Sequence, residues 1–193
     1  MNKSIDFYFD FISPYSYLAY KKIKNIKQKK INFNYKPILV GGLHKLQNIT
    51  APAFIKAKLN HVISDCDLIA KKNKINFIWN SKFPINSLNI MRGFLFAKDE
   101  SKNLYLNIMF DAYWKNNLDT SNEKILKTLL EKCKINSNNF FNGIKNPEIK
   151  DELKSLTQEA HNKEIFGAPT FVVNNKIFWG QDRLEFALDE YNR

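Results

Sequence analysis

A short serine-containing segment near the start of the chain is the first candidate for chemistry. Ser13, Pro14, Tyr15 and Ser16 follow an apolar run and precede a stretch with helical spacing. Ser is a favoured N-cap and Pro a favoured first helical residue, so the segment predicts a helix that begins at Pro14. The free N–H groups at such a helix end stabilise a thiolate or another anion. The alternative is that Ser13 only caps the helix.

Two segments near the end of the chain could take part in binding. Gly167–Thr170 places Pro169 at the start of an apolar run, which suggests a turn. A cis bond before this proline is a possibility, although the local sequence alone favours trans because only about 5–6% of X–Pro bonds are cis. Trp179–Arg183 opens a helix and carries Asp182, which could bind an ammonium group while the helix end binds a carboxylate. Alternatively, Asp182 is a plain N-cap and the arginine beside it a surface charge.

Predicted strands surround these segments. Period-two alternation or a short continuous apolar run indicates a strand, and such runs occur at 5–11, 31–35, 169–173 and 176–179. Pro37 is expected to stop the second strand, and Asn174 and Asn175 to form a hairpin turn between the last two. The first 40 residues therefore form a β-α-β unit, which favours a parallel pair of strands.

The middle of the chain, from Pro52 to about Asn146, instead follows helical periodicity, with breaks near 80–84, 98–101 and 116–122. The apolar faces expected there are Leu59, Val62, Cys66 and Ile69; Leu88, Met91 and Leu95; Leu104, Ile108 and Ala112; and Ile125, Leu126, Leu129, Leu130 and Cys133. Two more helices are expected, one over 149–160 and a last one that opens at Gly180–Asp182 and turns Leu184, Ala187, Leu188 and Tyr191 inward. We therefore predict an α/β fold in which 1–46 and 147–193 form one domain and 47–146 an all-helical insertion.

Composition excludes several classes of protein. Hydrophobic residues make up 44% and charged residues 25% of the 193, which is typical of a globular protein and not of a disordered, collagen-like or coiled-coil chain. Cys66 and Cys133 form neither a disulfide framework nor a C-x-x-C pair nor a zinc ligand set, so no metal is expected. The N-terminus lacks a signal-peptide pattern and no apolar run approaches about 18 residues. We expect a cytoplasmic protein that does not bind membranes.

The net charge of +11 invites the hypothesis of a basic binding module. Yet Arg92, Arg183 and Arg193 are the only arginines, and arginine is the residue preferred for bidentate phosphate contacts. The densest basic run, Lys21 to Lys30, is interrupted by isoleucines at helical spacing, which predicts the solvent-facing side of a helix. We therefore expect no specific binding of nucleic acid, and keep a non-catalytic basic module as an alternative.

Taken together, these segments and this order of elements resemble the thioredoxin superfamily, in the DsbA-like branch with a helical insertion. Ser13 and Ser16 stand where its redox members carry C-x-x-C. The stretches FYFDFISPYSYLA, FPINSLNIMRG and FGAPTFVVNNKIFWGQDRLE are similar to segments of 2-hydroxychromene-2-carboxylate isomerases and their relatives, the kappa-class glutathione transferases. The resemblance runs from about Ile5 to Tyr191. It implies an enzyme that uses glutathione, acts on an aromatic or unsaturated carboxylate, and forms a homodimer.

The resemblance also implies roles for particular residues. Ser13 would contact the glutathione sulfur and activate it without attacking the substrate itself. Ala168, placed before a cis Pro169, would pair its backbone with the tripeptide. The residues implied to hold the γ-glutamyl end are Gln181, Asp182 and Arg183.

Asn48 and Lys58 match the family's asparagine and lysine near the start of the helical insertion. The chain carries one extra residue in this stretch, so Lys56 is the alternative to Lys58. The implied reaction is a cis-trans isomerisation in which the sulfur adds to an unsaturated 2-oxo acid, the resulting single bond rotates, and the sulfur leaves. A kappa-type transferase or peroxidase using the same glutathione site is the alternative enzyme.

Overall fold

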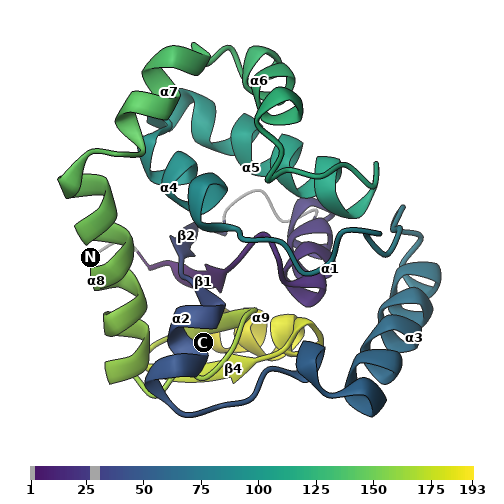
Figure 1. Ribbon diagram of the computed structural model, residues 1–193. Coiled ribbons are helices and arrows are strands. Elements are labelled where there is room, and N and C mark those ends of the chain that lie inside the picture. Colours follow the sequence, from purple (N-terminus) through teal and green to yellow (C-terminus); the bar gives the residue numbers. More distant parts are fainter. Residues whose placement is uncertain (1–2, 27–30) are drawn as a thin grey trace.

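A mixed four-stranded sheet organises the chain, with strands in the order β2-β1-β3-β4 (Figure 1). The computed structural model describes residues 3–26 and 31–193. The strands are β1 (Ile5–Phe9), β2 (Phe33–Pro37), β3 (Thr170–Val173) and β4 (Lys176–Trp179). β1 pairs parallel with β2, as the β-α-β unit predicts, and antiparallel with β3. β3 and β4 form the expected antiparallel hairpin.

The C-terminal ends of two strands differ from the prediction. β1 ends at Phe9, two residues before the predicted end, because the chain turns at Asp10. Pro37 was expected to stop the second strand and is instead its last residue. Proline is tolerated there because β2 lies at the edge of the sheet, where a missing N–H interrupts no ladder on its open side.

Helix α1 (Pro14–Lys24) begins where the sequence predicts and crosses from β1 to β2. Ile23 faces the core, as expected. Lys21 and Lys22, by contrast, are not free solvent-facing charges. The Nζ of Lys21 lies 2.6 Å from the Asp111 carboxylate, and the Nζ of Lys22 contacts Gln181. The predicted solvent-facing run is therefore wrong at these two positions, because other elements pack over this side of the helix; residues 27–30 lie outside the described part.

Six α-helices follow β2 before a long helix, Pro147–Asn162, leads back to the sheet, and most of the six lie in the upper and right-hand parts of Figure 1. They are α2 (Val40–Leu46), α3 (Lys56–Lys72), α4 (Leu88–Phe96), α5 (Asp99–Trp114), α6 (Glu123–Lys132) and α7 (Ser137–Gly143). The predicted breaks coincide with the junctions between α3 and α4, α4 and α5, and α5 and α6. The short helices α2 and α7 were not predicted as separate elements.

The apolar face predicted for α5 is partly wrong. Leu104 is 40% exposed, whereas Tyr105, Met109 and Ala112 are buried. Tyr105 and Met109 lie one position after the predicted Leu104 and Ile108, whereas Ala112 is buried as predicted. The face was misplaced because the prediction counted the aliphatic side chains and overlooked tyrosine, which buries a large apolar ring in the core.

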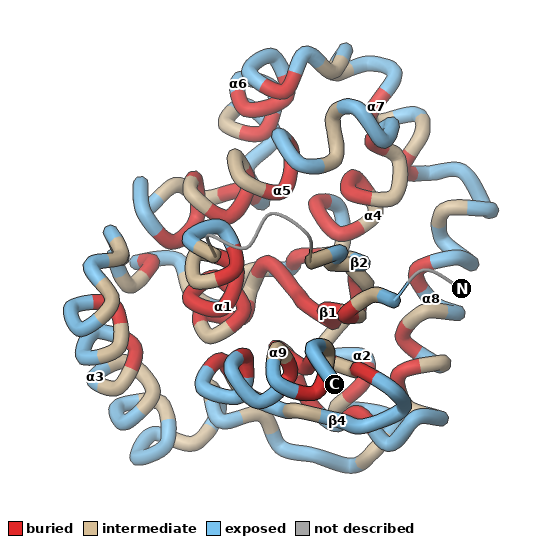
Figure 2. Tube along the Cα trace, turned by 180° about the vertical axis from the view of Figure 1, so that it is seen from behind, coloured by how far each residue is buried: buried red, intermediate tan, exposed pale blue. Residues whose placement is uncertain are grey.

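Aromatic side chains join the sheet and the helical segment in one core. The Phe9 ring lies 5.3 Å from that of Phe94 on α4, and the Phe11 ring 4.8 Å from that of Phe110 on α5. Trp114 Nε1 donates a hydrogen bond of 2.8 Å to the Phe11 carbonyl. In Figure 2, β1 and the segment that follows it are mostly buried, and among residues 5–14 only Asp6 and Ile12 are half-buried. This packing fixes the path of the chain from β1 into the start of α1.

The last elements complete the α-β-β-α order. α8 (Pro147–Asn162) leads back to the sheet, and α9 (Leu184–Asn192) ends the chain. A single 3₁₀ turn, Gln181–Arg183, precedes α9, so the final helix starts later than the predicted opening at Gly180. Among the helices of the described residues, none has the length and hydropathy to cross a membrane.

Candidate active site

Ser13 lies at the junction of β1 and α1 and makes two hydrogen bonds. Its Oγ accepts the Ser16 N–H over 3.1 Å, which makes it the N-cap, and donates to the Ala168 carbonyl over 2.8 Å. Pro14 has no N–H and the Ser16 N–H is used by the cap, so Tyr15 retains the N–H without an intrahelical acceptor. A hydroxyl and an amide donor thus occupy the positive end of α1, and both are suited to an anion.

The loop before β3 brings residues distant in sequence to Ser13. The Ala168–Pro169 bond is cis, as expected. Thr170 Oγ1 donates to the Gly167 carbonyl over 2.7 Å, and the Pro169 carbonyl accepts the Gly180 N–H over 3.0 Å. These bonds hold the Ala168 backbone beside α1. A second cis bond, Phe83–Pro84, was not anticipated.

The three residues expected to hold an amino-acid end differ in accessibility. Gln181 is buried and its side-chain oxygen contacts Lys22, so that oxygen is already engaged. Asp182 and Arg183 are exposed, and their charged groups lie 3.4 Å apart. The Asp182 side chain caps no helix here, since Gly180, with φ of 112°, occupies the cap position. Asp182 and Arg183 are therefore available to a carboxylate-and-ammonium ligand.

Asn48 and Lys58 are exposed, and the structure gives neither a direct contact with Ser13. Asn48 directly follows Gln47, whose amide donates to the Ile165 carbonyl over 2.9 Å, so it lies close to the loop before Pro169. Lys58 lies in the first turn of α3, the helix beside α1 in Figures 1 and 2.

The orientation of α3 bears on the choice between Lys58 and Lys56. The Tyr15 hydroxyl donates to the Asp65 carboxylate over 2.7 Å, so the side of α3 that carries Asp65 faces the start of α1. At 3.6 residues per turn, Lys58 lies on nearly the same side as Asp65, and Lys56 on the opposite side. Helix geometry therefore favours Lys58.

Asp10 is a buried carboxylate that sequence reasoning missed. It is 1% exposed and accepts the Ile12 N–H over 3.1 Å and the Val40 N–H over 3.0 Å. Its main-chain carbonyl accepts the Ser13 N–H over 3.0 Å. Burial raises the pKa of Asp10 to about 6, although the hydrogen bonds from Val40, Ile12 and Ser87 oppose that rise. The signal available in the sequence was an acidic residue directly after an apolar strand.

Neither cysteine can act as a nucleophile at this site. Cys66 and Cys133 are free thiols, 0% and 1% exposed. Burial raises the pKa of both thiols, that of Cys133 to about 12. Burial also lowers the pKa of His44, which packs near Phe166. Within the described residues, no cluster of His, Cys, Asp and Glu could hold a metal ion.

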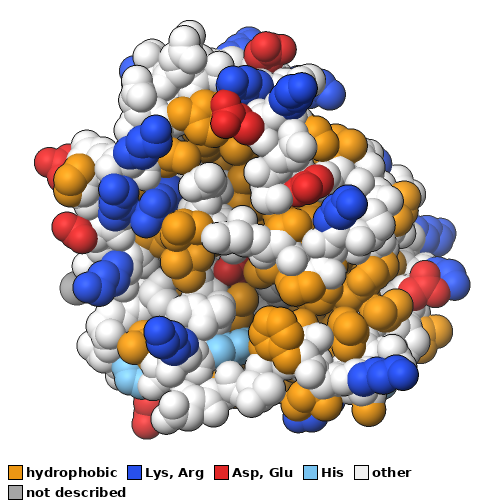
Figure 3. Space-filling model, in the orientation of Figure 1, with side chains coloured by type: hydrophobic (Ala, Val, Ile, Leu, Met, Phe, Trp, Pro, Cys, Tyr) orange, Lys and Arg blue, Asp and Glu red, His pale blue; other side chains and the backbone are white. Residues whose placement is uncertain are grey.

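The surface around the site is mixed in character. On the face shown in Figure 3, Lys and Arg side chains are scattered and hydrophobic side chains surround a hollow near the centre. Phe166 and Trp179, which flank the loop before β3, are 42% and 52% exposed, and their rings lie 4.8 Å apart. An apolar group bound beside this loop would therefore find aromatic surface.

Comparisons with known proteins agree with the fold. A family model described as a DSBA-like thioredoxin domain matches residues 4–192. A 2-hydroxychromene-2-carboxylate isomerase of Sphingobium xenophagum is 26% identical over 194 residues, covering 99% of this chain and 98% of that protein. Glutathione S-transferase kappa 1 of Caenorhabditis elegans is 28% identical over 211 residues, covering 96% and 89%. A solved structure of a 2-hydroxychromene-2-carboxylate isomerase matches with a TM-score of 0.89 at 24% identity, covering 98% and 94%.

Proposed function

We propose, from the premise that this chain belongs to the DSBA-like thioredoxin domain family, that it is a glutathione-dependent cis-trans isomerase. The substrate would be 2-hydroxychromene-2-carboxylate or a related unsaturated 2-oxo acid. The observation that carries the proposal is the Ser13 hydroxyl at the start of α1, 2.8 Å from the Ala168 carbonyl. The names of the relatives support the reaction class.

A serine at this position argues against thiol–disulfide exchange by the protein itself. That reaction needs a thiolate, and both thiols of the chain are buried with raised pKa values. The sulfur must come from outside the chain. When bound, glutathione supplies the sulfur nucleophile that adds reversibly to the substrate double bond.

The residues of the site fit such a ligand. The Ser13 hydroxyl and the Tyr15 N–H are donors at the positive end of α1, where a thiolate is stabilised. The Ala168 backbone lies next to them. Asp182 and Arg183 are exposed, so a carboxylate and a guanidinium can meet the ammonium and carboxylate of a γ-glutamyl end.

Ser13 would change its hydrogen-bond partner when the ligand binds. In the free protein its hydroxyl proton is directed at the Ala168 carbonyl. Donation to a sulfur anion instead would form a charge-assisted hydrogen bond, which is about twice as strong as a neutral one. The Ala168 carbonyl would then be free to accept an N–H of the tripeptide. Ser13 thus acts by lowering the pKa of the bound thiol.

The substrate side of the proposal rests on α3. Lys58 lies on the side of that helix that faces the start of α1, and it could hold the substrate carboxylate; Lys56 remains the alternative. The exposed rings of Phe166 and Trp179 offer apolar cover for an aromatic substrate.

A kappa-type transferase or peroxidase is the second candidate. The relatives named glutathione S-transferase kappa 1 favour it, and the same Ser13 site would serve it. The two candidates differ in the electrophile, which is an unsaturated 2-oxo acid for the isomerase and an aryl halide or a peroxide for the transferase or peroxidase.

One set of assays separates the candidates. Purified protein is mixed with reduced glutathione and 2-hydroxychromene-2-carboxylate, and isomerisation is followed by ultraviolet absorbance. We expect turnover that requires glutathione and falls strongly in Ser13→Ala but not in Ser16→Ala, the matched control in the same segment. Turnover of an aryl halide or peroxide without isomerisation would favour the kappa-type reaction. No turnover in any assay would refute both enzymes.

A further inference from the structure

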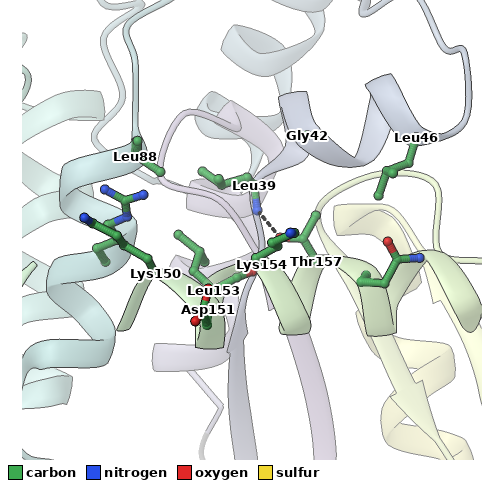
Figure 4. Close-up of a pocket in the computed structure, with 11 residues that line it drawn as sticks. Leu39, Gly42, Leu46, Leu88, Lys150, Asp151, Leu153, Lys154 and Thr157 are labelled. Atoms are coloured by element: carbon green, nitrogen blue, oxygen red, sulfur yellow. Dashed lines mark hydrogen bonds between the residues drawn. The ribbon is translucent and has the colours of Figure 1, made fainter. Parts of the chain in front are cut away.

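A pocket of about 360 Å³ lies between α2, the start of α4 and α8 (Figure 4). Leu39, Leu88 and Leu153, one from each of these regions, lie around the same space and, with Leu46, form its apolar lining. The Leu39 N–H donates to Thr157 Oγ1 over 3.1 Å, which ties the start of α2 to α8. The volume falls within the range of about 300–1,000 Å³ found for small-molecule sites.

The pocket is also strongly cationic. Arg92 of α4 and Lys150 and Lys154 of α8 line it, with Asp151 as its single acidic residue. In the part of the chain that the structure describes, no carboxylate lies within ion-pair distance of any of the three cations. The Nε of Arg92 is buried and has no hydrogen-bond partner. A half-buried guanidinium with a buried, unpartnered N–H is costly unless an acceptor is supplied.

We propose that this pocket binds a small carboxylate with an apolar, aryl or alkyl body, through Arg92. A guanidinium matches a carboxylate with two parallel hydrogen bonds, and the leucines would cover the apolar part of the same ligand. Lys150 and Lys154 add positive charge at the rim, where they steer an anion more than they bind it. The proposal does not depend on the glutathione site.

The pocket adjoins the candidate active site through Asp10. Leu39 and Leu88 are the chain neighbours of Val40 and Ser87, which both hydrogen-bond to the Asp10 carboxylate. The main-chain carbonyl of Asp10 accepts the N–H of Ser13. The carboxylate ligand could therefore be the acid group of the reaction's own substrate, held by Arg92 in place of Lys58, or a separate effector. Both have the same chemistry, and kinetics distinguishes them.

The test uses trans-cinnamate as the probe and cinnamamide as its neutral, isosteric control, each titrated into the full-length protein by calorimetry. We expect cinnamate to bind at least about tenfold more tightly than the amide, the loss expected when a charge-assisted hydrogen bond is removed. Arg92→Gln should weaken cinnamate binding by a similar factor. Lys154→Gln, on the exposed rim, should weaken it less and reduce its salt dependence, and it keeps the test valid if the Arg92 variant does not fold.

Two controls separate this site from the glutathione site. Ser13→Ala should leave cinnamate affinity unchanged, and Lys132→Gln, an exposed lysine on α6, should also have no effect. Competitive inhibition of isomerisation by cinnamate would identify the pocket as the substrate's acid subsite, whereas non-competitive inhibition or activation would identify an effector site. Equal affinity for cinnamate and cinnamamide, or an affinity unchanged in both Arg92→Gln and Lys154→Gln, would overturn the proposal.

Discussion

Asp10 makes a specific prediction about how the stability of the protein depends on pH. Its carboxylate is 1% exposed, and burial raises its pKa from an ordinary 3.8 to about 6. A carboxyl group with a raised pKa holds its proton more tightly in the folded than in the unfolded chain. Its contribution to the free energy of unfolding is therefore fully present below about pH 3.8 and is lost as the pH rises through about 6.

The size of this effect follows from the two pKa values. A difference of about two between folded and unfolded states corresponds to about 3 kcal/mol, since each pH unit is about 1.4 kcal/mol. Asp10→Asn removes the titration but keeps a similar shape and one acceptor oxygen for the Ile12 or Val40 N–H. The stability of the wild type relative to this variant should therefore fall by about 3 kcal/mol between pH 4 and 7.

Urea unfolding followed by tryptophan fluorescence at several pH values measures this difference. Other titrating groups, His44 included, are common to both proteins and cancel in the comparison. Ser87→Ala serves as a second variant: it removes a hydrogen bond that lowers the pKa of Asp10, so the pH transition should move upward. Parallel stability curves for wild type and Asp10→Asn across this range would refute the reasoning.

Four further substitutions have outcomes that the structure predicts. Ser13→Ala should lower the free energy of unfolding by about 1 kcal/mol in urea titrations because it removes an N-cap, whereas Ser16→Ala should leave it unchanged or raise it, since the Ser16 hydroxyl is buried without a partner. In Gly167→Ala the new Cβ would lie 2.7 Å from Nε1 of Trp179, which is too close. The substitution should therefore lower the free energy of unfolding by about 1–3 kcal/mol and alter the fluorescence of Trp179. Asp182→Asn should raise the calorimetric Kd for glutathione about tenfold or more while turnover at saturating glutathione persists.

Local signals in the sequence were enough to predict most of the helices and strands. Ser13 and Pro14 place the start of α1 because capping and the fixed φ of proline act within a few residues. The two asparagines at 174 and 175 place the hairpin for the same reason: both adopt the positive φ that such turns require. Helix α2 escaped prediction because its seven residues include two glycines and bury only Leu43, so it shows no clear periodic face.

The resemblance to a family, and not local pattern, assigned Ser13 and Ala168 to one glutathione site, and the structure places the Ser13 hydroxyl 2.8 Å from the Ala168 carbonyl. Contacts that form only when distant elements pack together could not be predicted from the sequence. Lys22 looked like one more solvent-facing lysine, yet it reaches Gln181 because the 3₁₀ turn packs against α1. Asp10 was not singled out from the sequence, because its burial and its hydrogen bonds depend on the packing of α2 and α4 over it.

The central claim is that Ser13 lowers the pKa of a thiol borrowed from glutathione. The most direct test is the ultraviolet absorbance of the bound thiolate, titrated against pH in wild type, Ser13→Ala and Ser16→Ala. The wild type and the Ser16 variant should show a bound thiol with a pKa below the value of about 8.5 for a free thiol. Ser13→Ala should raise that pKa by about one to two units, the equivalent of one charge-assisted hydrogen bond. No binding at millimolar glutathione by folded protein, or the same thiol pKa with and without the serine, would contradict the claim.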